Sequence, residues 1–285
     1  MRSARVGVLA AALGFAICAA AADIPRRIVS LSPDLTEMIY GVGALASVVA
    51  VSNYDAYPPE VLKLPRLGPL ESTNLEKLIA LQPDLVVINS SQAPFLEDTL
   101  RQLNFRILKA SNKTVAEAYQ AMLAIGRATG HESEAEKLVS ATREGLDRVA
   151  RKTAGLPKPR VAMIVDRTPG TLRDLYDATG GSYLAELVDI AGGRMAVAAV
   201  NIGYAKLSKE DLVAANPDII LDFVHGFTGR FSADPVAAWN EMPELKAVRE
   251  HRVYSVSEDF VPHASQRMVQ TAELFARLIH PERKQ

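Results

Sequence analysis

The residues of this chain that could do acid–base or metal chemistry do not occur at the spacing of any known catalytic or metal-binding motif. The sequence contains no phosphate-binding glycine loop, no G-x-S-x-G nucleophile elbow and no H-E-x-x-H zinc motif. Two of its five histidines, His225 and His263, follow predicted strands of the second half and could face a cleft. Two histidines without a third ligand at a known spacing are a weak metal signal. We therefore predict no catalytic residue and no metal site, and keep an exported metal-dependent enzyme as a minor alternative.

The aromatic residues indicate binding rather than catalysis. They make up only 6% of the chain. Tyr57 lies in a polar loop of the first half, and Tyr176, Tyr204 and Phe260 lie in segments that join strands and helices of the second half. Ligands bind outside the carboxyl ends of parallel strands, and exposed tyrosines there suit a large, flat, amphipathic ligand. The alternative is that these rings pack onto the nearest helix.

Two stretches of the chain resemble each other and predict the framework that positions these residues. LEKLIALQPDLVVI at 75–88 and KEDLVAANPDIILD at 209–222 each read as a helix, a proline that ends it, and a buried apolar strand. The offset is constant at 134 residues, as from Glu76 to Glu210. RIVSLS at 27–32 and RVAMIV at 160–165 make a further pair of strands. The pattern predicts an α/β fold of two similar lobes with central parallel sheets.

A helical segment without a flexible linker separates the two lobes. Residues 132–153 form a run of about 30 Å at 1.5 Å per residue, and AGLPKPR after it breaks the helix. We predict an N-terminal lobe at 23–113, a spanning helical segment at 114–155 and a C-terminal lobe at 156–285. A long helix across both lobes would hold them at a nearly fixed separation, with a ligand cleft between them.

The N-terminus indicates export. Arg2 and Arg5 precede an apolar run from Val6 to about Ala20, followed by small residues, so residues 1–22 read as a cleavable signal peptide rather than a membrane anchor. Cys18, the only cysteine, lies inside this segment and follows Ile17, whereas lipoprotein signals place a small residue there. We predict a periplasmic protein without disulfides. A formal net charge of −1 and the lack of a basic stripe argue against a nucleic-acid partner.

From Arg27 onward the chain resembles the substrate-binding proteins of ABC importers with a rigid helical backbone. RIVSLSPDLTEMIYGVG, SNYDAYPPE, TNLEKLIALQPDLVVI, the spanning helix and the late ASQR carry the resemblance. Within that family the chain is most similar to the periplasmic vitamin B12 (cobalamin) binding proteins. The resemblance implies capture of cobalamin or a related corrinoid, with no resident cofactor, and delivery to a dimeric ABC permease in the inner membrane. Relatives of the same fold bind ferric siderophores or haem, which is the alternative.

The resemblance also assigns ligand-binding residues. Tyr57, Tyr176 and Tyr204 match pocket aromatics of the cobalamin binders, with polar contacts expected from Arg173 or His225. Leu70 stands where the best-known cobalamin binder has a tryptophan, which leaves a corrinoid precursor or another macrocycle open. Siderophore binders place arginines in the cleft, and the candidates for that role are Arg167, Arg173 and Arg230. The loop RLGPLESTN lacks the tyrosine iron ligand of the haem binders.

Glu76 and Glu210 occupy equivalent positions in the repeat. In the family that the chain resembles, one glutamate at the top of each lobe docks onto arginines of a two-fold symmetric permease. The resemblance implies that role for these two residues, since carboxylate–arginine pairs give orientation as well as affinity. The alternative, which is compatible with docking, is that both are first-turn glutamates favoured by the helix dipole.

Overall fold

The structure is a computed structural model that describes residues 24–69, 72–197, 203–223 and 235–282. The predicted signal peptide with Cys18, and also Leu70, His225 and Arg230, lie outside the described residues. Within the described part of the chain, no helix combines the length and the apolar character needed to cross a membrane.

The N-terminal lobe is built on a four-stranded parallel sheet in the order β2-β1-β3-β4. Its strands are β1 (Ile28–Ser30), β2 (Val48–Val51), β3 (Leu85–Asn89) and β4 (Ile107–Ala110). Its helices are α1 (Pro33–Gly41), α2 (Leu75–Leu81) and α3 (Ala93–Gln102), with short 3-10 turns at Leu45–Ser47 and Pro59–Lys63. Every residue of β3 is buried, as expected for a strand covered on both faces.

The C-terminal lobe holds a six-stranded sheet whose main path is β10-β9-β5-β6-β8, with β7 paired to β5. Its strands are β5 (Arg160–Asp166), β6 (Leu175–Ala178), β7 (Arg194–Met195), β8 (Tyr204–Leu207), β9 (Ile219–Phe223) and β10 (Val253–Val256). Its helices are α6 (Tyr183–Ile190), α7 (Lys209–Ala215), α8 (Lys246–Arg249) and α9 (Met268–Ile279), with a 3-10 turn at Ala237–Glu241.

This second sheet is mixed: the central strands are parallel, as the sequence predicts, and an antiparallel part lies beside them. β6 runs antiparallel to both β5 and β8, whereas β9 is parallel to β5 and to β10. The reason is local: a tight connection at residues 167–174, closed by a hydrogen bond from Thr168 N to Arg173 O of 2.9 Å, joins β5 to β6. Such a short connection reverses the chain, while a parallel neighbour needs a long crossover.

The internal repeat is present in three dimensions. Strands β3 and β9 lie 134 residues apart, and the helices before them, α2 and α7, keep the same offset. Both helices end at a left-handed residue, Gln82 with φ of 45° and Asn216 with φ of 38°, one residue before the proline. The fold class predicted from the sequence, two similar α/β lobes joined by a long helix, is confirmed.

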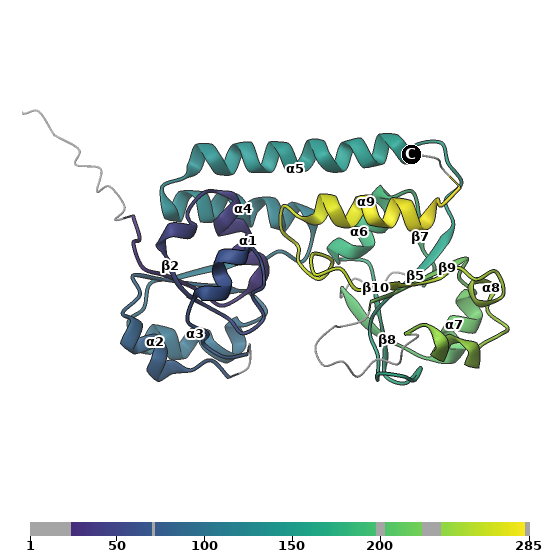
Figure 1. Ribbon diagram of the computed structural model, residues 1–285, viewed down its shortest axis with the longest axis horizontal. Coiled ribbons are helices and arrows are strands. Elements are labelled where there is room, and N and C mark those ends of the chain that lie inside the picture. Colours follow the sequence, from purple (N-terminus) through teal and green to yellow (C-terminus); the bar gives the residue numbers. More distant parts are fainter. Residues whose placement is uncertain (1–23, 70–71, 198–202, 224–234, 283–285) are drawn as a thin grey trace, which may run out of the picture.

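Helix α5 (Glu132–Thr153) crosses both lobes, after α4 (Val115–Thr129) has returned the chain to the far end of the first lobe (Figure 1). It packs on α4 and α1 of the first lobe and on α6 and α9 of the second. Close packing on α9 depends on Gly145, where an added Cβ would lie 2.7 Å from a methyl carbon of Val269. One apolar core runs through these helices into both lobes, which restricts their relative motion.

Candidate functional site

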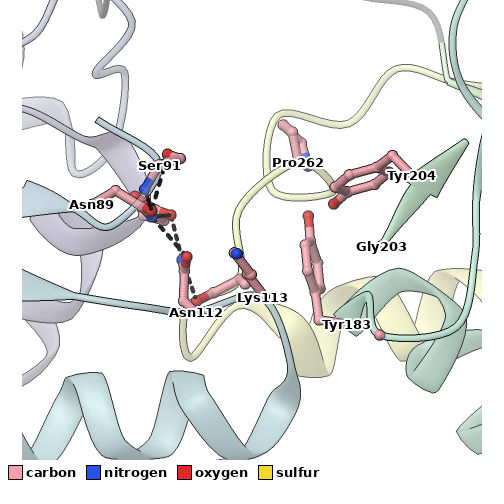
Figure 2. Close-up of a pocket in the computed structure, with 11 residues that line it drawn as sticks. Asn89, Ser91, Asn112, Lys113, Tyr183, Gly203, Tyr204 and Pro262 are labelled. Carbon is pink, nitrogen blue, oxygen red and sulfur yellow. Dashed lines mark hydrogen bonds between the residues drawn. The ribbon is translucent and has the colours of Figure 1, made fainter. Parts of the chain in front are cut away.

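A cavity of about 300 Å³ lies between the lobes. Its walls come from both of them (Figure 2). The first lobe contributes Asp34, Asn89, Ser91, Asn112 and Lys113, and the second contributes Gly181, Tyr183, Gly203, Tyr204, Pro262 and Ala264. The residues of the first lobe lie at or shortly after the ends of β1, β3 and β4, at the carboxyl edge of the sheet. This is the edge at which α/β proteins bind ligands.

A hydrogen-bonded network fixes the wall of the first lobe. Asp34 accepts from the side-chain amides of both Asn89 and Asn112. Asn89 also donates to Asn112 Oδ1 at 2.7 Å, and its own oxygen accepts from the Ser91 backbone and hydroxyl at 3.0 Å. These contacts orient neutral amide and hydroxyl groups at the cavity. Lys113 adds one ammonium group, which points into the space before the tyrosines (Figure 2).

Two tyrosines form the facing wall. Tyr183 is buried at the start of α6 and donates its hydroxyl to Val261 O at 2.8 Å. Tyr204 begins β8, is 44% exposed, and turns its hydroxyl toward that of Tyr183 (Figure 2). Burial of the hydroxyl, and then the charge of Asp34, raise the pKa of Tyr204 to about 12. Burial also raises the pKa of Tyr183 well above its ordinary value. Both groups are therefore neutral phenols at physiological pH.

A second hollow of about 220 Å³ continues from this wall. It shares Tyr183, Tyr204 and Pro262 with the first, and is otherwise apolar. Gly203, with φ of +85°, lines the cavity just before β8, and a side chain there would be strained. The site thus combines an apolar, phenol-bearing wall with a polar wall of amides that also carries the Asp34 carboxylate and the Lys113 ammonium.

The junction between the lobes contains a buried carboxylate that the sequence did not reveal. Glu37 of α1 is 1% exposed and accepts from the hydroxyl of Ser265, from His263 Nδ1 at 2.8 Å and from Arg267 at 3.0 Å. Burial alone would lower the pKa of His263, but the hydrogen bond and charge of Glu37 outweigh it and raise that pKa. These contacts join α1 of the first lobe to the segment that precedes α9, and they use His263 structurally.

Arg267 gathers two of the predicted aromatics at this junction. Its guanidinium carbon lies 4.2 Å from the ring centroid of Tyr57 and 5.3 Å from that of Phe260. It also pairs with Asp259 at 2.9 Å. Tyr57 packs edge-on against Tyr40, with ring centroids 5.6 Å apart. Tyr57 and Phe260 thus lie together beside the cleft, outside the residues that line its cavity.

The other predicted ligand contacts are dispersed. Tyr176 lies on the same face of the β6–β8 pair as Tyr204. Tyr204 pairs with Ala178, and Tyr176 is two residues before Ala178 in β6, so both tyrosines point to that face. Tyr176 is exposed but does not line the cavity. Arg173 is exposed in the β5–β6 turn, also away from the cavity, and His225 lies outside the described residues.

Arg167 is not available to an anionic ligand, which corrects its candidacy. It is buried and bound to Asp222 at 2.8 Å, with further hydrogen bonds to Thr171 O and Pro235 O. For metals, no group of three or more histidine, cysteine, aspartate or glutamate side chains gathers among the residues that the structure describes.

The residues missed from the sequence are mainly those of the polar wall. No role in ligand binding is predicted from the sequence for Asp34, Asn89, Asn112, Lys113 or Tyr183. A signal was present, because these residues directly follow predicted strands or start the helix after one. Polar residues at the carboxyl ends of parallel strands are candidates for ligand contact just as aromatic ones are.

Residues 28–260 match a known protein family, described as periplasmic binding protein. The chain belongs to the periplasmic binding protein family. Among its relatives, the uncharacterized ABC transporter substrate-binding lipoprotein YvrC of Bacillus subtilis is 30% identical over 263 residues, covering 90% of this chain and 81% of that protein. A vitamin B12-binding protein of Vibrio cholerae is 26% identical and covers 91% of each chain. These findings confirm the resemblance seen in the sequence.

Solved structures of this periplasmic binding protein's relatives agree on the fold. The crystal structure of the periplasmic vitamin B12-binding protein of Vibrio cholerae has a TM-score of 0.76 at 26% identity, covering 92% of this chain and 99% of that one. The periplasmic haem-binding protein HutB of Vibrio cholerae has a TM-score of 0.77 at 22% identity, covering 90% and 99%. The second similarity bears on the fold alone. The same architecture therefore serves more than one ligand class.

Proposed function

We propose that this periplasmic binding protein captures cobalamin or a related corrinoid between its lobes and delivers it to the dimeric permease of an ABC importer. It would reach the periplasm through the signal peptide at residues 1–22, and it would act as a binding protein, not as an enzyme. Glu76 and Glu210 would dock it onto the permease. The full-length similarity to vitamin B12-binding proteins supports this choice of ligand.

The single observation that carries the ligand proposal is the pairing of the two cavity walls. A corrinoid is a flat macrocycle with an apolar ring and carboxamide arms at its edge. Tyr204 and Tyr183 offer aromatic surface to such a ring, and the amides of Asn89 and Asn112 offer hydrogen-bonding partners for carboxamides. A cavity of about 300 Å³ is small for a ligand pocket. We infer that the cavity binds one edge of the macrocycle, and that the remainder of the macrocycle extends toward Tyr57, Phe260 and Tyr176.

Ferric siderophores and haem fit this site less well. An anionic iron chelate calls for cations, and among the described residues Lys113 is the single cationic side chain that lines the cavity. Arg167, a candidate for that role, is held by Asp222. The propionate groups of haem would meet the same single ammonium group.

Tyr204→Ala is expected to weaken binding of cyanocobalamin roughly 10- to 100-fold, because it removes a central aromatic contact. Equilibrium dialysis, read out by the visible absorbance of the corrinoid, measures the change. Tyr204→Phe should retain most of the affinity, since it keeps the ring and loses only the hydroxyl. Tyr176→Ala is the matched control on the same face of the sheet and should have a smaller effect. An unchanged affinity for Tyr204→Ala would remove this cavity from the ligand site.

A further inference from the structure

The two short helices that carry Glu76 and Glu210 present the same surface to solvent. Residues 74–83 and 208–217 have the same sequence of buried, intermediate and exposed positions, residue by residue. Each helix is anchored by one buried leucine, Leu78 or Leu212. The equivalence of the two segments thus extends from the sequence to the surface that a partner would meet.

The glutamates on these helices have no partner among the described residues. Neither the Glu76 nor the Glu210 carboxylate has a hydrogen bond or ion pair with any other residue that the structure describes. Capping of α7 is done by its neighbour Asp211, which accepts from the Ser208 backbone at 3.0 Å. In α2 the cap is Asn74, which accepts from Lys77 N at 2.9 Å. The two charges are therefore not needed to complete their own helices.

Beside each glutamate stands an exposed aliphatic residue. Ile79 is 47% exposed and Val213 is 46% exposed. Each lies three residues after its glutamate, so acid and aliphatic side chain share one face of the helix. The next residue is alanine in both cases, Ala80 and Ala214. The β-branched residues isoleucine and valine are weaker helix formers than glutamate, lysine or glutamine, so helix propensity does not explain them at solvent positions.

The two surfaces lie in comparable places on the molecule. Helices α2 and α7 are at the ends of their lobes that point away from α5, one on each lobe (Figure 1). Because α5 and its apolar core join the lobes, the distance between the two surfaces changes little. Two like surfaces at a fixed separation match a partner that offers one binding position on each of two equivalent subunits.

We propose that Ile79 and Val213 each insert into an apolar pocket of a two-fold symmetric membrane permease, next to the cationic side chain that receives Glu76 or Glu210. The inference rests on the proposed delivery to such a permease and adds a second kind of contact to it. The glutamates give orientation, and the aliphatic side chains give affinity that salt does not screen. Ala80 and Ala214 allow the partner to approach the helix closely.

The test measures binding of the full protein to the purified permease–ATPase complex of its importer, held in lipid nanodiscs, by surface plasmon resonance. The apolar variant is Ile79→Gln with Val213→Thr, which keeps similar side-chain size and exposure. We expect its affinity for the complex to fall roughly 10- to 100-fold, and the loss to persist at high salt. The charge variant, Glu76→Ala with Glu210→Ala, should bind the complex more weakly than the unaltered protein, and this difference should shrink as the salt concentration rises. The same variant should abolish uptake.

Two controls separate docking from folding and from ligand capture. Glu136→Gln, an exposed acid on α5, should dock like the unaltered protein. Cyanocobalamin affinity should be nearly the same in all of these variants. If the apolar variant docks normally while the charge variant does not, the inference is wrong and the docking glutamates stand. If the unaltered protein does not bind the importer complex, delivery and the inference fail together, whatever the ligand titration shows.

Discussion

Asp222→Ala is expected to lower the free energy of unfolding by about 3–5 kcal/mol, because it strands a buried guanidinium. Asp222 in β9 and Arg167 at the end of β5 are both almost fully buried and pair at 2.8 Å. The same carboxylate accepts from the indole of Trp239 at 2.8 Å. Removing it leaves two buried donors without their acceptor. Urea denaturation followed by circular dichroism and by the fluorescence of Trp239, the only tryptophan, measures the loss.

Two further variants keep this prediction open to refutation. Asp222→Asn retains one acceptor and should lose less stability than Asp222→Ala. The double variant Arg167→Met with Asp222→Ala should recover part of the stability, because it also removes the unpaired buried charge. The matched control is Asp189→Ala, which breaks an exposed pair with Lys158 at 2.7 Å and should cost less than about 1 kcal/mol. A loss for Asp222→Ala as small as that control would contradict the account of this ion pair.

Asp177→Asn is expected to stabilise the protein at pH 7 by on the order of a few kcal/mol, less the cost of burying the amide. Asp177 lies in β6 between Ile164 and Ala205 and is 1% exposed. Among the residues that the structure describes, neither carboxylate oxygen has a partner at full hydrogen-bond geometry, and the Met163 backbone is only a weak one. Burial raises the pKa of this carboxyl to about 8, with only the backbone of Met163 acting in the opposite direction. The folded protein therefore holds a proton on Asp177 at neutral pH, which the unfolded chain releases.

The sign of the pH dependence follows from that difference. Between pH 4 and pH 8 the folded state binds one more proton than the unfolded state, so stability falls by about 1.4 kcal/mol per pH unit as the pH rises. Asparagine is neutral in both states and removes this slope. Thermal or urea unfolding at several pH values should show that Asp177→Asn raises the free energy of unfolding over that of the unaltered protein. The difference should be near zero at pH 4 and should grow toward pH 8.

The exposed neighbour Asp166, changed to asparagine, is the control and should alter stability by less than about 0.5 kcal/mol. Asp177→Leu tests whether the cost lies in the carboxyl group itself, since it removes the buried polar atoms altogether. A loss of stability on Asp177→Asn at pH 7 would mean that the carboxylate is charged and paired in the folded protein.

The framework could be predicted because its signals are local. The proline after each repeated helix, the apolar runs of β3 and β9, and the 22-residue helix α5 are all readable from a short window of sequence. Strand β6 escaped prediction because it is four residues long and carries Asp177 at a buried position. A buried ionisable residue breaks the apolar pattern by which strands are found in a sequence.

The site was only partly predictable because long-range contacts assemble it. Tyr204 lines the cavity as its position before α7 suggested. The hydrogen bond between Glu37 and Arg267 joins residues 230 positions apart in the sequence, and the hydrogen bond between Asp34 and Asn112 joins residues 78 positions apart. Neither pair can be found in one sequence, since hydrogen bonds across a fold leave no periodic signal. The polar wall therefore emerged only from the structure.

The measurement that tests the central claim most directly is a calorimetric titration of the chain without residues 1–22 with cyanocobalamin, in parallel with haem and with a ferric siderophore. The account predicts one-to-one binding of cyanocobalamin, with a negative heat-capacity change from burial of the ring against the tyrosines. Neither iron compound should bind with comparable affinity. Binding of haem or the ferric chelate without any response to cyanocobalamin would contradict the account, leaving the fold intact but assigning the cleft to iron.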